Sequence, residues 1–157
     1  MIGLPYQTIE NLADDLLFFK SMDVDMVGMG PYIQHPDTPL ALDPIAMNDE
    51  SKLLLSIKMI ALLRRLMPWI NIASTTALQV LHPMGREYGL LSGANIVMPN
   101  LTDSMQRGNY QLYSGKPGLQ DDAEATKTGL LKNLRDVGIP VGWNVQGNPI
   151  RKKDFRV

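Results

Sequence analysis

Three small groups of side chains in this sequence have the types and spacing to bind a ligand. Thr75 and Thr76 are adjacent hydroxyls, which can hold a carboxylate or other polar group through side-chain and backbone donors together. Tyr110 and Tyr113 stand three positions apart, so on one helical turn their rings share a face. Met98 offers a thioether, a soft contact that does no acid–base work. These types indicate binding, and we assign no catalytic residue.

Metal chemistry by the chain's own side chains is not expected. His35 and Asp37 flank Pro36, and one imidazole beside one carboxylate falls short of the three or four ligands that zinc takes. We expect these residues to shape their loop. The sequence contains no cysteine, so the chain forms no disulfide and offers no thiolate to iron or zinc. We therefore assign no metal ligand.

Composition places the chain in the class of cytoplasmic α/β domains. Its 157 residues fit one domain, and 45% apolar residues suffice for a core. The net charge is −1 and no basic block occurs, so we expect no nucleic-acid partner. No apolar run reaches the roughly 18 to 20 residues of a membrane span, so we expect no membrane partner either.

One pattern occurs four times along the chain, an apolar β-like run followed by a turn and a helical periodicity. The predicted strands cover residues 2–5, 25–33, 70–76 and 94–99. The predicted helices cover roughly residues 8–22, 49–67, 83–92 and 121–137. The tail, residues 139–157, is rich in Gly, Pro and charge and is assigned no element.

Two details of the helices are predicted from spacing and charge. In the helix at 49–67, the expected buried stripe consists of Leu53, Leu54, Ile57, Ile60, Ala61 and Leu63. Basic side chains separated by polar gaps are expected on solvated faces; they are Lys52, Lys58, Arg64, Arg65 and Lys132.

Strands without polar alternation, separated by helices, predict a parallel sheet with helices outside it. An open doubly wound sheet and a (βα)8 barrel both meet this description. The first lacks support, because Gly28-Met29-Gly30-Pro31 has neither the third glycine nor the helix start of a dinucleotide fingerprint. Polar residues instead follow the strand ends, where barrels build their sites. With four units of eight, residues 1–138 are predicted to form the C-terminal half of a (βα)8 TIM-type barrel.

Several motifs, in this order, resemble those of a radical S-adenosylmethionine (SAM) enzyme. They are MIGLPYQT, GMGPYIQHPDTPL, NIASTTALQVLHPMGREYGLLSGANIVMPNLT and NYQLYSGKP. The likeness is to the C-terminal half of the HydE family, the radical SAM maturases of FeFe-hydrogenase. That group also contains biotin synthase and methylornithine synthase. The resemblance covers roughly residues 1–138.

The resemblance implies cofactors and roles for individual residues. The family uses a 4Fe–4S cluster, held by a three-cysteine motif, and SAM, held partly by a Gly-Gly-Glu-type motif; neither motif occurs here. By resemblance the SAM-contacting residues are Pro31, Tyr32, Ile33 and Met98. The residues implied to contact a small amino-acid or sulfur-containing substrate are Thr75, Thr76, Tyr110 and Tyr113.

The resemblance also implies that the chain begins at the fifth barrel strand and is inactive alone. Its expected partner is the N-terminal half of the same barrel, and open sheet edges would favour self-association. Two alternatives stay open. The chain could belong to a biotin synthase-like or methylornithine synthase-like enzyme, or it could be a non-catalytic half-barrel that binds a ligand.

Overall fold

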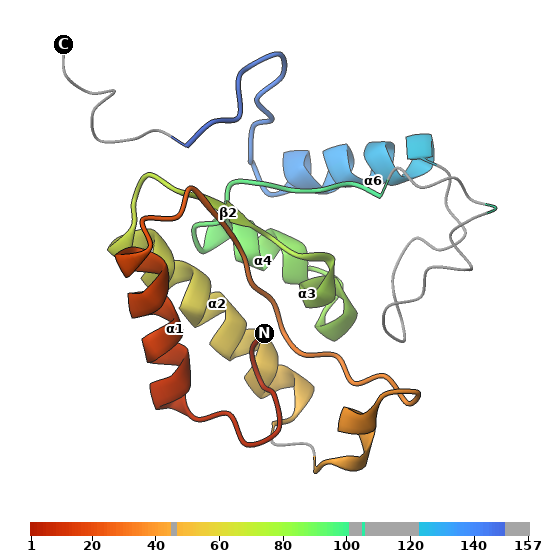
Figure 1. Cartoon of the computed structure of the whole chain (residues 1–157). Helices are drawn as coiled ribbons and strands as arrows, with labels where there is room; N and C mark the ends of the chain where they lie inside the picture. The colour runs from red at the N-terminus through yellow and green to blue at the C-terminus, as the bar shows by residue number, and fades with distance from the viewer. Residues whose placement is uncertain (45–46, 101–104, 106–122, 150–157) are drawn as a thin grey trace.

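The computed structural model describes residues 1–44, 47–100, 105 and 123–149 (Figure 1). Helices and short parallel strands alternate along the chain, as an α/β fold requires. In chain order the elements are α1 (Ile9–Ser21), β1 (Met26–Gly28), the 3₁₀ helix η1 (Pro39–Leu42), α2 (Asp49–Leu66), β2 (Asn71–Ala73), α3 (Thr76–Leu81), α4 (Gly85–Leu91) and α6 (Ala123–Asp136).

Local capping explains where the first two long helices begin. Thr8 and Asn11 form a capping box at the start of α1, because each side chain accepts a hydrogen bond from the other's backbone N–H. Asn48 caps α2 by accepting from the backbone N–H of Ser51 at 2.8 Å. The predicted helices at 8–22 and 49–67 are therefore confirmed to within one residue at each end.

The predicted helix at 83–92 is confirmed as α4, but a second short helix, α3, precedes it and was not predicted. The chain turns directly from β2 into α3, breaks at His82 and Pro83, and resumes as α4. Gly85 makes this tight pairing possible, because a Cβ there would clash with the carbonyl group of Leu78. Periodicity alone did not reveal α3, since a six-residue helix shows less than two turns of pattern.

The sheet is parallel, and neighbouring segments follow one another in chain order. Met26, Val27 and Gly28 of β1 pair with Asn71, Ile72 and Ala73 of β2. Single parallel bridges join Ile2 to Pro31 on one side and Ala73 to Ile96 on the other. The segments predicted as strands at 2–5 and 94–99 thus lie on the two outer sides of the β1–β2 pair, parallel to it. Each of them makes only one bridge. Among the described segments, the order in the sheet follows the order in the chain without a reversal.

The core lies between this sheet and its helices. Figure 1 shows α1 and α2 side by side, and α2 also contacts α3 and α4. The least exposed apolar side chains of the core are Ile2, Leu12, Ile60, Leu63, Met67, Ile70, Ile72, Ala73 and Leu78. Their burial on one side of the sheet fixes which face the helices cover.

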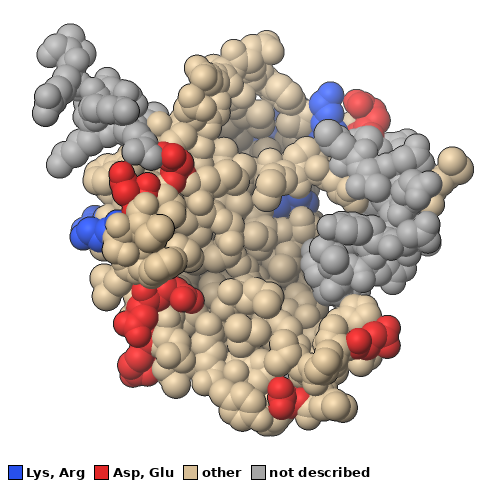
Figure 2. All heavy atoms as spheres, in the orientation of Figure 1, with Lys and Arg blue, Asp and Glu red and all other residues tan. Residues whose placement is uncertain are grey.

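The opposite face of the sheet is partly uncovered. Val27 and Met29 are buried, whereas Met26 and Gly28, which alternate with them along the chain, are exposed, as expected for a strand. Met1, which precedes the bridged residue Ile2, lies on the uncovered side by the same alternation, with an exposure of 66%. We call Met1, Met26 and Gly28 the open face. In Figure 2 acidic side chains lie around the margin of the visible surface, and its centre carries no acidic group.

The buried stripe of α2 differs from the prediction. Ile60 and Leu63 are buried as expected, but Leu54 is 52% exposed. The remaining buried positions are Lys52, Ser56 and Met59, so the stripe includes a basic residue and a hydroxyl. None of the described helices is long and apolar enough to cross a membrane.

Candidate functional site

A cavity of about 440 Å³ opens at the carboxyl ends of the strands. Four of the predicted site residues line it, and they come from the segments that follow β1 and β2; they are Pro31, Tyr32, Ile33 and Thr75. The remaining lining residues are Met1, Gly30, His35, Thr38, Leu40 and Ala77. The lining is mostly apolar, as in pockets for small organic molecules.

Thr75 fits this site only because residue 30 is a glycine. A Cβ at Gly30 would clash with the hydroxyl of Thr75 and come within 3.3 Å of its Cβ. The Thr75 hydroxyl is buried and has no hydrogen-bond partner among the described residues. Buried polar atoms nearly always have a partner, so this hydroxyl is an exception among the described residues.

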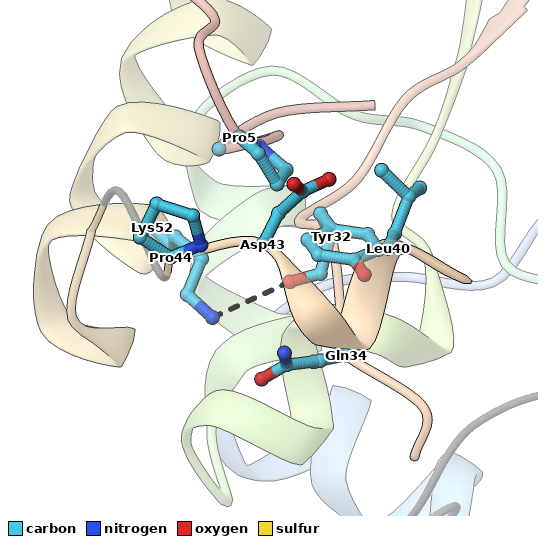
Figure 3. Close-up of a pocket in the computed structure, with 8 residues that line it drawn as sticks. Pro5, Tyr32, Gln34, Leu40, Asp43, Pro44 and Lys52 are labelled. Carbon is cyan, nitrogen blue, oxygen red and sulfur yellow. Dashed lines mark hydrogen bonds between the residues drawn. The ribbon is translucent and has the colours of Figure 1, made fainter. Parts of the chain in front are cut away.

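Tyr32 carries a second buried hydroxyl without a partner in the described part of the chain. Its backbone is held on both sides. The N–H of Tyr32 donates to the carbonyl of Ile2 at 2.8 Å, and its carbonyl accepts from Nζ of Lys52 at 3.4 Å (Figure 3). Two cavity residues therefore present hydroxyl groups that the described protein atoms leave unused.

Lys52 is buried, which contradicts its predicted place on a solvated face. The residue is 6% exposed, and its ammonium lies 2.8 Å from Oδ1 of Asp49. A small cavity of about 20 Å³ adjoins it, bounded by Gly3, Pro5, Tyr32, Gln34, Leu40, Asp43, Pro44 and Lys52. Tyr32 and Leu40 also line the large cavity, so they form the wall between the two.

Polar contacts define the loop beyond Tyr32. Nδ1 of His35 accepts from the backbone N–H of Asp37 at 3.2 Å, and the hydroxyl of Thr38 donates to the carbonyl of His35 at 2.8 Å. The predicted role of His35 in shaping this loop agrees with these contacts. At the loop's end the hydroxyl of Tyr6 donates to Asp43 at 3.2 Å. The negative charge of Asp43, and then this hydrogen bond, raise the pKa of Tyr6.

Thr76 and Met98 line a different cavity from Thr75. This second cavity measures about 170 Å³, and Gln79, Arg86, Asn100, Ala125, Thr126, Gly129, Leu130 and Asn133 complete its lining. The structure therefore places the two adjacent threonines in separate cavities. Tyr110 and Tyr113 lie outside the described residues, so their predicted role stays a prediction.

Sequence reasoning missed two buried charged residues on α4. A terminal nitrogen of Arg86 donates to Oε1 of Gln79 at 2.6 Å. Glu87 is fully buried and accepts from Nδ2 of Asn133 at 3.0 Å, which ties α4 to α6. In the sequence, Gly85 and Gly89 on either side of these two residues could have indicated a closely packed helix. A Cβ at Gly85 or Gly89 would clash with its neighbours, so α4 packs closely enough to bury polar side chains.

Arg64 was also predicted on a solvated face, and that prediction is wrong. Its guanidinium donates to the carbonyls of Gly93, Pro68 and Ile70 and to Oδ1 of Asn95, at 2.7 to 3.0 Å. Burial lowers the pKa of Arg64 from its ordinary value. These contacts lie at the amino end of β2, away from the candidate site.

The C-terminal tail reaches this same end of the sheet. Nδ2 of Asn71 donates to the carbonyl of Gly147 at 2.7 Å, and Nδ2 of Asn95 donates to Oδ1 of Asn71 at 2.9 Å. A cavity of about 470 Å³ lies here between the tail, Arg64 and the starts of the strands. In the described part of the chain no group of three His, Asp or Glu side chains could hold a metal ion.

These features define an α/β protein with a cavity at the carboxyl ends of parallel strands, the position where barrel proteins build their sites. Among known proteins, no family model matches the chain. It is 53% identical over 116 residues to the [FeFe] hydrogenase maturase subunit HydE of Thermotoga maritima. The match includes 74% of the chain, which spans about a third (32%) of the relative's length.

The predicted resemblance to HydE, a radical SAM maturase, is thereby confirmed. The similarity supports the placement of this chain among radical SAM proteins.

Proposed function

We propose that this chain supplies one wall of a radical SAM barrel, where it contacts SAM and a small substrate. The observation that carries this proposal is the pair of buried, unpartnered hydroxyls on Thr75 and Tyr32 in residues that line one cavity. Both residues lie where barrel enzymes place ligands, at the carboxyl ends of parallel strands.

The strand arrangement supports the half-barrel. Parallel segments in strict chain order suit a barrel, whereas doubly wound sheets reverse their order at a switch point. The open face would then line the barrel interior and meet the remaining strands. The match to about a third of the length of HydE agrees with a partial set of barrel units.

The described residues suit SAM. Pro31, Tyr32 and Ile33 provide a flat apolar shelf for an adenine ring, and the unused hydroxyls offer hydrogen bonds to its polar groups. Met98 lines the second cavity and is 57% exposed; in the proposed complete site it packs against the cofactor from the segment at 94–99. When bound and reduced by one electron, SAM supplies radical chemistry; the residues named here bind and orient it.

The chain does not suit the 4Fe–4S cluster. Such clusters are held by cysteine thiolates, and the sequence has no cysteine. We infer that any cluster ligands belong to the remaining barrel strands, and that this chain is inactive without them. Thr76, Tyr110 and Tyr113 complete the proposed substrate wall, and the substrate is a small amino-acid or sulfur-containing molecule.

The similarity to HydE favours a maturase over a biotin synthase-like or methylornithine synthase-like enzyme. Complementation tests the proposal. The chain is mixed with a polypeptide that carries the part of Thermotoga maritima HydE outside the matched region, and SAM binding is measured by calorimetry after cluster reconstitution. We expect the mixture to bind SAM at least about tenfold more tightly than either component.

Thr75→Val and Tyr32→Phe remove the unused hydroxyls and should each weaken SAM binding by the mixture several-fold, at an unchanged melting temperature. Lys58→Met, at an exposed position of α2, serves as the control. If the chain adds nothing to the SAM affinity of its complement, the proposed function is wrong. Tight SAM binding by the chain alone would favour a self-sufficient binding module.

A further inference from the structure

The buried ammonium of Lys52 needs a physical explanation. Burying a charged group costs several kcal/mol unless partners compensate for the lost hydration. Lys52 is 6% exposed, and its ammonium contacts Asp49 at 2.8 Å and the carbonyl of Tyr32 at 3.4 Å. The Asp49 side chain is 69% exposed, so it needs no buried partner of its own. The contact that requires a buried position is the one to Tyr32.

The stem of Lys52 packs over the first strand segment. A Cβ at Gly3 would lie only 2.7 Å from Cγ of Lys52, so the stem and the Gly3 backbone are in close contact. Gly3 has φ of 85°, a left-handed conformation that leaves this side of its backbone open. An unbranched apolar side chain such as Met could fill the same space. Packing against Gly3 therefore explains the burial of the Lys52 methylene groups. It does not explain why the side chain ends in an ammonium group.

The ammonium of Lys52 provides the second hydrogen bond to the backbone of Tyr32. The N–H of Tyr32 is already held by the carbonyl of Ile2 at 2.8 Å, and the Lys52 ammonium holds its carbonyl. With both backbone polar groups held, the peptide planes around Tyr32 are set, and so is the direction of its Cα–Cβ bond. Figure 3 shows Lys52 reaching from α2 to this carbonyl across the small cavity.

We propose that Lys52 is a positioning residue: by holding the carbonyl of Tyr32, it orients the aromatic wall of the large cavity for its ligand. The effect of Lys52 on Tyr32 is inferred from the structure alone. Its consequence for ligand binding rests on the proposed function. Through Lys52, α2 would contribute to the site, which the prediction of a solvated Lys52 did not suggest.

Hydrogen exchange on the intact chain tests the effect on Tyr32. In Lys52→Met the stem is kept and the donor removed, so we expect the Tyr32 amide to exchange about tenfold faster. Lys52→Arg retains a donor and should restore slow exchange. Lys58→Met is the matched control on the same helix. The amides of Asn71 and Ser74, which are hydrogen-bonded within the sheet, should keep their rates in every variant.

Two outcomes would overturn the proposal. In the first, the Tyr32 amide in Lys52→Met exchanges at the wild-type rate. In the second, all sheet amides speed up equally, which would show that Lys52 serves general stability only. SAM affinity of the complemented protein gives the functional readout, and we expect about a tenfold loss in Lys52→Met with recovery in Lys52→Arg. If the complemented wild type binds no SAM, the proposed function fails while the exchange result still decides the role of Lys52.

Discussion

Nδ2 of Asn71 donates a 2.7 Å hydrogen bond to the carbonyl oxygen of Gly147, a residue 76 positions further along the chain. Asn71 is 7% exposed and opens β2, and Gly147 lies in the C-terminal tail. The contact holds the tail across the amino end of the sheet, opposite the candidate site. The described part of a segment that the sequence left without an element, residues 139–149, thus has a defined contact with the sheet.

The first prediction concerns this contact. Asn71→Asp keeps the acceptor oxygen for Asn95 but replaces the donor with an oxygen that repels the Gly147 carbonyl. Losing one buried hydrogen bond typically costs about 1 kcal/mol, so amides 142–148 should exchange roughly fivefold faster or more. Gln146→Glu adds the same charge within the tail and is the control. Unchanged exchange in Asn71→Asp would show that other contacts hold the tail.

The second prediction concerns the close approach of Gly30 and Thr75. Gly30→Ala places a methyl group against the Thr75 side chain and should destabilise the fold by about 1 to 3 kcal/mol in urea unfolding. Gly28→Ala is the control, because a Cβ there meets nothing within 4 Å. Thr75→Ala should recover part of the loss in the double variant. Equal effects of the two glycine substitutions would contradict the predicted clash.

The third prediction compares two neighbouring arginines in the last turn of α2. Arg64 donates four hydrogen bonds to the ends of two other segments, whereas Arg65 is exposed. Arg64→Met should lower the free energy of unfolding by about 2 to 4 kcal/mol, because several carbonyls lose a charged donor. Arg65→Met should change it by less than about 0.5 kcal/mol. Denaturant unfolding measures both, and similar losses would refute the contrast.

The fourth prediction concerns the open face. Met26 is 46% exposed there, and we expect the isolated chain to self-associate through this surface. Met26→Lys should reduce association in sedimentation experiments, because pairing would bury an uncompensated charge. Met22→Lys is the control, since Met22 is 60% exposed at the end of α1, outside the open face. A wild-type chain that sediments only as a monomer would count against this use of the face.

The fifth prediction concerns pH. Hydrogen bonds from its own backbone N–H and from Thr8 lower the pKa of Glu10 below 4.5. A lowered folded-state pKa adds stability at pH values above the unfolded pKa, and this stability disappears as pH falls through the folded value. Glu10→Gln should therefore lower the melting temperature slightly at pH 7. The difference should vanish in strong acid, and a constant difference at all pH values would be inconsistent with this linkage.

The sequence by itself determined the features that depend on neighbours along the chain. Thr8 and Asn48 marked helix starts because a cap needs only a side chain and the next turn's N–H groups. Apolar runs alternating with helices indicated parallel strands, and the motifs indicated HydE, which the 53% identity confirmed. Pro31, Tyr32, Ile33 and Thr75 line one cavity, because carboxyl ends of parallel strands share one edge, and their roles in binding stay predictions.

Only the tertiary structure decided which polar groups are buried and what they contact. Lys52 and Arg64 carry the same charge as Lys58 and Arg65 on the same helix, and no local signal separates the two pairs. Their burial depends on backbone groups at Tyr32 and Gly93, which lie far away in sequence. Likewise Thr75 and Thr76 are adjacent but line different cavities, because a cavity is formed by segments that packing brings together.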